Sequence, residues 1–273
     1  MEKTRLDVLL VERGLIPGRE RAKAIVMSGD VFIGGKRADK PGMQVKTDAI
    51  IEVRSTPEYV SRGGIKLEKA LTVFDISPDG KVCLDCGAST GGFTDCLLKN
   101  GARLIYAVDV GYGQLAWSLR SDSRVVVMER TNIRYVTADM FTEKPELTVI
   151  DVSFISLGLV LPVIRQLLKN NADVICLVKP QFEAGRDKVG KKGVVRDPET
   201  HTEVLNTFIN NAGAAGFTVK GITHSPVRGP EGNIEYLSHL CCSGEHIHID
   251  SAAVVMKSHK ELRDEKNYTL SEQ

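Results

Sequence analysis

The stretch VICLVKPQFE, residues 174–183, places a lysine directly after a run of apolar residues and directly before a proline. The apolar run is typical of a buried strand, so Lys179 stands where that strand leaves the core. Either the lysine marks the exit into solvent, as most lysines do, or its ammonium group takes part in chemistry at the strand end. Polar residues at the ends of other strands favour the second alternative.

Strand patterns alternate with amphipathic helical patterns from Lys81 onward. One such helical pattern is LGLVLPVIRQLLKN, residues 157–170. Alternation of this kind predicts an α/β domain with a doubly wound sheet, and ligands of such sheets bind outside the carboxyl ends of the strands. The expected strands are residues 81–86, 103–110, 124–129, 147–151, 174–179, 218–225 and 234–241.

The first strand runs into a glycine-rich turn, LDCGASTGGFTDCLL, residues 84–98. The turn is not a dinucleotide fingerprint, because the second glycine of G-x-G-x-x-G is missing, and it is not a P-loop, because no lysine follows Gly91–Gly92. The remaining pattern, D-x-G-x-x-x-G-G-F, resembles the first motif of S-adenosylmethionine-dependent methyltransferases. A plain strand–helix turn is the alternative.

The physics of the turn suits a nucleoside cofactor, because glycines let the backbone approach a ligand closely. Asp109, at the end of the second strand, stands where a carboxylate can accept hydrogen bonds from two ribose hydroxyls. The resemblance implies S-adenosylmethionine as cofactor and a Rossmann-like class I methyltransferase sheet. The residues it assigns to the cofactor are Asp85, Gly87, Ser89, Thr90, Gly91, Gly92, Phe93 and Asp109.

Motifs that the sequence lacks limit the possible acceptors of the methyl group. Cytosine-C5 methyltransferases use a cysteine that normally follows a proline, and no cysteine here follows one. Enzymes that methylate exocyclic adenine nitrogens typically carry [DN]-P-P-[YFW] at the end of the fourth strand, where this chain has DVSF from Asp151. Lys66 lies before the sheet, and Glu235 lies in the stretch GNIEYL. Together with Asp151 and Lys179, these two residues resemble the K-D-K-E tetrad of FtsJ-type ribose 2′-O-methyltransferases.

That resemblance implies a division of roles. A ribose hydroxyl is a poor nucleophile and must lose its proton as it attacks the sulfonium methyl group. Lys179 would assist by taking the proton or by stabilising the developing alkoxide, and Asp151 would orient Lys179 and the hydroxyl. Lys66 and Glu235 would complete the network and hold the ribose. The alternatives are a solvated helix lysine for Lys66, a helix N-cap for Asp151 and a surface strand residue for Glu235.

The N-terminal segment has its own pattern. Residues 5–13 carry Leu6, Leu9 and Leu10 on one helical face, residues 18–29 predict a second helix, and DVFIGGKRADKPG predicts a hairpin that turns at Gly34–Gly35. The segment resembles the small α+β RNA-binding domain first described in ribosomal protein S-four, although a solvated cap without a ligand is the alternative. The resemblance assigns RNA binding to Arg5, Arg19, Arg21, Lys23, Lys36 and Arg37.

An S-four-type domain followed by an FtsJ-like domain is similar to the TlyA family of bacterial rRNA methyltransferases, some of which have been described as hemolysins. YVSRGGIKLEKAL, AVDVGYGQLAW and ERTNIR also carry this resemblance. It implies 2′-O-methylation of cytidine in rRNA of the large subunit, in some members also of the small subunit, with Asn132 near the cofactor adenine. The domains would be residues 1–60 with the linker, 61–245 for methyl transfer, and a tail, 246–273, that is helical or disordered.

Composition sets wider bounds. The chain is 42% hydrophobic and 26% charged with a net charge of +1, which is typical of a globular protein. No apolar run approaches the ~20 residues that span a bilayer, and the charged start is unlike a signal peptide. We therefore expect a cytoplasmic monomer with no membrane or metal partner. Cys83 and Cys86, three apart in a strand, should point to opposite faces as packing residues rather than ligands.

Three other functions are alternatives to rRNA methylation. A membrane-active hemolysin needs an amphipathic or spanning segment that the sequence does not display. An inactive RNA-binding or ribosome-assembly factor has no need of an intact tetrad. A methyltransferase of a different RNA stays open, because the motifs specify the chemistry better than the substrate. The sequence also suggests a hinge at Gly63–Gly64, and it leaves residues 183–198 as either a mobile RNA-contacting lid or an ordinary loop.

Overall fold

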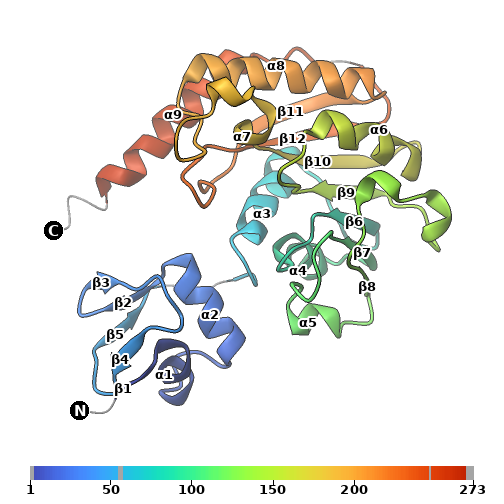
Figure 1. Cartoon of the computed structure of the whole chain (residues 1–273). Helices are drawn as coiled ribbons and strands as arrows, with labels where there is room; N and C mark the ends of the chain where they lie inside the picture. Colours follow the sequence, from blue (N-terminus) through green and yellow to red (C-terminus); the bar gives the residue numbers. More distant parts are fainter. Residues whose placement is uncertain (1–2, 55–57, 246, 269–273) are drawn as a thin grey trace.

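The buried apolar residues gather in three clusters: one in the N-terminal domain and one on each face of a seven-stranded sheet. The structure is a computed structural model, and it describes residues 3–54, 58–245 and 247–268. Figure 1 shows the N-terminal domain set apart from the sheet domain, to which it is joined through the start of α3 (Gly63–Phe74).

The N-terminal domain is built from two short helices and two small antiparallel sheets, β1–β4 and β3–β2–β5. Its hairpin turns at Gly34 and Gly35, whose φ values of 55° and 78° are conformations that glycine adopts readily. The predicted helices and hairpin are therefore confirmed. The elements are β1 (Lys3–Arg5), α1 (Leu6–Glu12), α2 (Arg19–Ser28), β2 (Val31–Ile33), β3 (Lys36–Arg37), β4 (Gln44–Lys46) and β5 (Ile51–Val53).

The larger domain contains one sheet in the order β11-β12-β10-β9-β6-β7-β8, in which β12 runs antiparallel to both neighbours. All seven strands expected from the sequence are present. They are β6 (Val82–Cys86), β7 (Leu104–Val108), β8 (Val125–Met128), β9 (Leu147–Ile150), β10 (Asp173–Val178), β11 (Thr218–His224) and β12 (Tyr236–Cys241).

Helices cover both faces of the sheet, so the predicted doubly wound α/β fold is confirmed (Figure 1). α3, α4 and α5 pack on one face, and α6, α8 and α9 pack on the other. Cys83 faces the first group and Cys86 the second, as the strand period predicts. The remaining helices are α4 (Gly92–Lys99), α5 (Trp117–Arg120), α6 (Leu157–Leu167), α7 (Pro180–Glu183), α8 (Pro198–Ala214), α9 (Ser251–Tyr268), and the short 3₁₀ turns η1 (Ile133–Tyr135), η2 (Ala138–Met140) and η3 (Arg186–Lys188).

The connections reverse direction between β6 and β9, which lie side by side and parallel. From β6 the chain continues to β7 and β8 on one side, and then returns to β9 and β10 on the other. Ligand-binding crevices form at such reversal points, outside the carboxyl ends of the strands. The ends of β6 and β9 therefore mark where a ligand is expected.

The C-terminal segment forms α9, which packs on α8 and β11 (Figure 1). Its Val255 and Leu262 are buried in the core, and the buried Ser258 hydroxyl lies 3.2 Å from the Tyr236 hydroxyl. The sequence left this tail as a helix or as disorder; over Ser251–Tyr268 it is a helix. Within the described part of the chain, no helix is long and apolar enough to cross a membrane.

Replacing Leu262 by Ala is expected to lower the free energy of unfolding by about 2–5 kcal/mol, because the residue is only 3% exposed and the substitution leaves a cavity. Met256, on the same helix, is 69% exposed, so Met256→Ala should change stability by less than about 0.5 kcal/mol. Urea unfolding followed by circular dichroism measures both. Equal effects of the two substitutions would contradict the packing of α9.

Candidate active site

The four residues predicted as a tetrad form two ion pairs at the carboxyl edge of the sheet. Lys66 Nζ, from α3, lies 2.5 Å from Glu235 Oε2, and Lys179 Nζ lies 2.6 Å from Asp151 Oδ1. The Lys66 and Glu235 side chains are only 9% and 1% exposed, so neither is a solvated surface residue. Asp151 is no helix cap, since Ser156 caps α6. The strand-end lysine thus has a specific acidic partner.

A cavity of about 240 Å³ lies beside these pairs, outside the ends of β6 and β9. It reaches one member of each ion pair, Lys66 and Asp151, so the two pairs flank a common space. The cavity is lined by Ser61, Arg62, Gly63, Lys66, Gly87, Ala88, Ser89, Thr90, Gly92, Phe93, Asp151 and Pro230. Most of these residues come from the glycine-rich turn and from the segment that opens α3.

The glycines of this turn are needed for close approach. Gly87 has a φ of 90°, and a Cβ there would lie 2.5 Å from the Asp151 carbonyl oxygen. A Cβ on Gly92 would lie 2.2 Å from Ser61 Oγ. Gly63 and Gly64, suggested by the sequence as a hinge, instead begin α3, and a Cβ on Gly64 would meet the Tyr59 ring. Here glycine serves tight packing rather than bending.

Asp109 supports the glycine-rich turn through its carboxylate. Its two carboxylate oxygens accept hydrogen bonds from the backbone N–H of Ser89 and of Gly111, both at 2.7 Å. Ser89 has a φ of 47°, an uncommon conformation for a residue with a side chain. Asn132 starts η1, where its Oδ1 accepts from the Arg134 N–H. Neither Asp109 nor Asn132 is among the residues that line the cavity.

Asp85 is a fully buried carboxyl group beneath the turn, where Thr94 Oγ1 donates a hydrogen bond to it at 2.7 Å. Burial raises its pKa from 3.8 to about 7, and the nearby charges of Asp151 and Asp109 act in the same direction. Its second oxygen has no hydrogen-bond partner among the described residues. Asp85 therefore supports the turn and does not line the cavity.

The loops after β9 and β10 are joined by contacts that the sequence analysis did not identify. Lys179 Nζ donates a hydrogen bond to Ser153 Oγ at 2.9 Å, in addition to its pair with Asp151. Further along, the rings of Phe154 and Phe182 lie 4.9 Å apart between centroids. Phe154 has a φ of 63° and is 91% exposed. An exposed aromatic ring on a residue with an uncommon backbone conformation is a candidate binding surface.

Glu183 forms the last contact between these loops. Its carboxylate accepts hydrogen bonds from Ser156 Oγ at 2.7 Å and from the Leu157 N–H at 2.8 Å. Burial raises the pKa of this carboxyl group. Glu183 ends the motif LVKPQFE, and Ser156 lies in DVSFISL, so the two motifs that carry Lys179 and Asp151 are held together.

The loop after α7 is also attached to the sheet domain. The buried Asn233 donates from Nδ2 to the Gly193 carbonyl and accepts at Oδ1 from the Val195 N–H, at 2.9 and 3.0 Å. Because Glu235 lies two residues further on, the loop and the catalytic edge share a support. These bonds anchor the loop's end and favour an ordered connection over a free lid.

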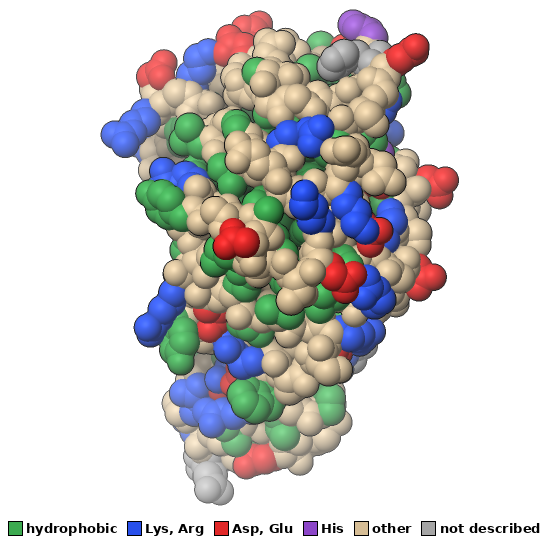
Figure 2. Space-filling model, turned by 90° about the vertical axis from the view of Figure 1, so that its right-hand side faces the viewer, with side chains coloured by type: hydrophobic (Ala, Val, Ile, Leu, Met, Phe, Trp, Pro, Cys, Tyr) green, Lys and Arg blue, Asp and Glu red, His purple; other side chains and the backbone are tan. Residues whose placement is uncertain are grey.

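The basic residues predicted to bind RNA lie in the N-terminal domain, and all but the half-buried Lys23 are exposed. Arg5 and Arg19 are both paired with the buried Asp7, at 2.9 and 3.1 Å, and the hydrogen bond from Arg5 is the main reason that the pKa of Asp7 falls to about 2. Figure 2 shows Lys and Arg side chains over the middle of one face and over its lower end, where this domain lies. The remaining predicted residues are Arg21, Lys23, Lys36 and Arg37.

Two known protein families match this chain over the two domains described above. The family described as FtsJ-like methyltransferase matches residues 59–241, and the S4 domain matches residues 4–51. A solved chain from Listeria monocytogenes, described as a "putative S-adenosylmethionine dependent methyltransferase", is 14% identical with a TM-score of 0.51 over 67% of this chain and 99% of that one, and shares the fold. The fold and site therefore define an FtsJ-like methyltransferase that carries an S4 domain.

Relatives with higher sequence identity indicate a particular family within this class. The chain is 54% identical to the Bacillus subtilis protein named "Putative rRNA methyltransferase YqxC", with 97% of each chain covered. It is 46% identical to the 16S/23S rRNA (cytidine-2′-O)-methyltransferase TlyA of Mycobacterium tuberculosis, over 86% of this chain and 88% of that one. A solved "Putative hemolysin" from Streptococcus thermophilus is 46% identical with a TM-score of 0.79, over 98% and 99%. The chain belongs to the TlyA family.

The pH dependence of stability should report on Asp85. A folded-state pKa of about 7 against 3.8 means that the folded protein binds more protons between pH 4 and 7, so Asp85 lowers stability as the pH rises through that window. Asp85→Asn removes this effect and should become more stable relative to wild type by up to about 1.4 kcal/mol per pH unit. Urea unfolding at pH 5 and pH 8 measures the difference, and a gap independent of pH would contradict it.

Glu183→Gln should slow methyl transfer about 10- to 100-fold, because an amide can replace only one of the two accepted hydrogen bonds and the Asp151 and Lys179 loops then shift. Cofactor affinity should stay unchanged, since Glu183 does not line the cavity. The exposed Glu199→Gln is the matched control. A loss of cofactor binding equal to the loss of rate would show general disruption instead of positioning.

Proposed function

We propose that this protein transfers a methyl group from S-adenosylmethionine to the 2′-hydroxyl of a cytidine in ribosomal RNA. The observation that carries the proposal is the pair of ion pairs beside the cavity at the carboxyl edge of the sheet. The names of its TlyA relatives support the same reaction on cytidine. S-adenosylmethionine, when bound, supplies an electrophilic methyl group on a sulfonium.

The cavity and its surroundings fit such a cofactor. The glycine-rich turn presents backbone groups without side chains in the way, and the carboxylate of Asp109 retains lone pairs for hydroxyl donors beyond the two backbone bonds it accepts. Asn132 lies in the same region, because the Thr131 N–H donates to the Asp109 carbonyl. We assign cofactor binding to Gly87, Ser89, Thr90, Gly91, Gly92, Phe93, Asp109 and Asn132, with Asp85 supporting the turn from below.

Lys179 acts on the hydroxyl group. Its Nζ lies 2.6 Å from Asp151 Oδ1 and faces the end of the strand, so we assign it the stabilisation of negative charge on the ribose oxygen while the proton leaves to water. Asp151 and Ser153 hold the ammonium group in place. Lys66 and Glu235, enclosed on the other side of the cavity, fix a second charged pair against which the ribose and its phosphate can be oriented.

Phe154 provides a surface for the target base. Its exposed ring stands on the same loop as Asp151 and rests against Phe182. Aromatic side chains commonly hold unstacked bases in RNA-binding proteins, and stacking contributes about 1–3 kcal/mol per base. A flipped cytidine stacked here would bring its ribose toward Lys179.

The S4 domain supplies the first contact with RNA. Its exposed arginines and lysines are suited to phosphates, and the Asp7 pairs keep Arg5 and Arg19 in fixed positions at the start of the two helices. Ribosomal RNA is the proposed partner, and a different RNA is the second candidate. The monomeric state and the cytoplasmic location stay predictions.

Lys179→Met tests the proposal. Methyl transfer from labelled S-adenosylmethionine to purified, unmethylated 50S and 30S subunits, and to their naked rRNAs, should fall about 10²- to 10⁴-fold. Cofactor affinity should change little, since Lys179 does not line the cavity. Lys169→Met, which removes a half-exposed lysine paired with Glu146 at the opposite edge of the sheet, is the control.

Three outcomes separate the candidates. A ribose label, mapped by resistance of the 3′ phosphodiester to alkaline cleavage, that disappears only in Lys179→Met supports the proposal and identifies the subunit. Cofactor binding without label on either subunit points to a different RNA. Absence of cofactor binding by the wild-type protein overturns the assignment of the glycine-rich turn.

A further inference from the structure

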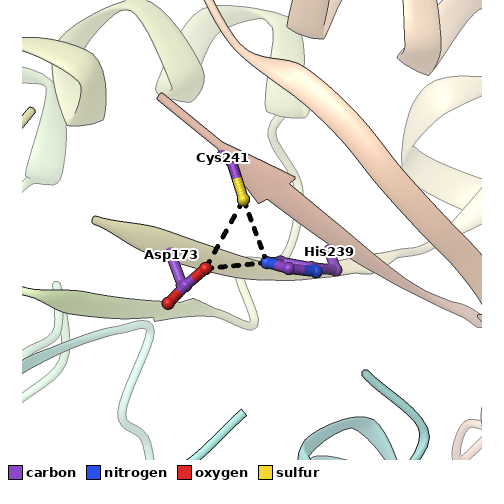
Figure 3. Close-up of side chains that lie close together, drawn as sticks. All are labelled: Asp173, His239 and Cys241. Carbon is purple, nitrogen blue, oxygen red and sulfur yellow. Dashed lines mark hydrogen bonds and ion pairs between the residues drawn. The ribbon is translucent and has the colours of Figure 1, made fainter. Parts of the chain in front are cut away.

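Three potential metal-binding side chains converge at the edge of the sheet opposite the tetrad. Among the described residues, Asp173, His239 and Cys241 form a group whose donor atoms all lie within 4.8 Å of one another (Figure 3). His239 Nε2 lies 2.9 Å from Asp173 Oδ1, and Cys241 Sγ lies 3.3 Å from His239 Nε2 and 3.5 Å from Asp173 Oδ1.

Strand register produces this convergence. His239 and Cys241 are two residues apart on β12, so they project from the same face, and Asp173 is the direct cross-strand partner of Cys241 on β10. The backbone of two paired strands therefore fixes all three positions. The sequence predicts no metal site here, because Asp173 lies 66 residues before His239 and the antiparallel pairing is what brings them together.

The separations suit one tetrahedral ion. With zinc–ligand bonds of about 2.0–2.3 Å, tetrahedral geometry places neighbouring ligand atoms roughly 3.4–3.6 Å apart. The observed separations are 2.9, 3.3 and 3.5 Å, so the histidine–carboxylate distance must widen by about half an ångström and the cysteine–histidine distance by a smaller amount, about 0.1–0.3 Å. The Asp173 and His239 side chains are 25% and 13% exposed, which leaves a side open for a fourth ligand such as water.

The neighbouring cations have acceptors of their own. Lys81 Nζ lies 3.5 Å from Asp173 Oδ2, the oxygen that points away from the cluster. Hydrogen-bonding partners of this kind orient the carboxylates that bind metal ions, so Lys81 would hold Asp173 in place. Lys220 donates to the Glu245 carbonyl. A thiolate, an imidazole and a carboxylate together carry a charge of −2, which a divalent ion neutralises.

We propose that Asp173, His239 and Cys241 bind one divalent metal ion of borderline softness, with zinc the best match to an N, S and O donor set. The ion would clip β10 to β12. Lys179 directly follows the other end of β10, and Glu235 directly precedes β12. The metal is thus a structural clip for the strand pair that supports the catalytic edge, and it takes no part in methyl transfer.

Cobalt(II) binding to the metal-free chain, prepared without an affinity tag, tests the proposal. We expect one Co²⁺ per chain with the near-ultraviolet absorption of a thiolate–cobalt bond, displaced by Zn²⁺. Cys241→Ser should abolish this absorption, and His239→Asn should weaken binding by at least about 10-fold. Cys242→Ser is the matched control, because this neighbouring thiol lies outside the cluster and should leave the spectrum unchanged. Circular dichroism confirms the folding of each variant.

Zn²⁺ should also raise the unfolding midpoint of the wild type and of Cys242→Ser, but not of Cys241→Ser. Absence of a thiolate–cobalt band in the wild type, or a band that survives in Cys241→Ser, overturns the proposal. Methyl transfer measured with and without the metal keeps this result separate from the proposed reaction, since metal-free protein that methylates normally leaves that reaction intact.

Discussion

The enclosed ion pair between Lys66 and Glu235 is the constraint on which the carboxyl edge of the sheet depends. The two side chains come from α3, before the sheet, and from the segment that enters β12, near its end. Removing one partner of a buried pair leaves an uncompensated charge and typically costs about 3–5 kcal/mol. The pair therefore ties α3 directly to β12, on which the helix also packs, and it links the start of the domain to a strand near its end.

Negative charge is concentrated on the inner side of the glycine-rich turn. Asp85, Asp109 and Asp151 follow one another at the ends of β6, β7 and β9, and burial raises the pKa of Asp85 to about 7. Asp109 and Asp151 are satisfied instead, by backbone N–H groups and by Lys179. Each acidic group is therefore buried or paired, and of the three only Asp151 lines the cavity.

Much of this organisation was predictable, for a physical reason. Strand and helix periods fix which residues are buried, so the seven strands, the hairpin at Gly34–Gly35 and the opposite directions of Cys83 and Cys86 followed from local pattern. Pairings across the fold did not. Nothing in the sequence says that Lys66 pairs with Glu235 and not with Asp151, that Glu183 bonds to Ser156, or that Gly64 is packed against Tyr59. These depend on register and on close approach, which only the assembled sheet determines.

The two domains have separate hydrophobic cores, and this separation limits how a contact made by one domain can alter the other. In the described residues, the core of the N-terminal domain is formed by α1, α2 and their short strands, while the tetrad is held by ion pairs within the sheet domain. Among the described residues, no hydrophobic cluster spans the two domains, so a contact made by the S4 domain does not reach Lys179 through a common core. Under the proposed function, an RNA bound to both domains would itself fix their relative orientation and bring one ribose to the carboxyl edge of the sheet. On that proposal, the shape of the RNA between the two contact points contributes to substrate choice together with the base at the cavity.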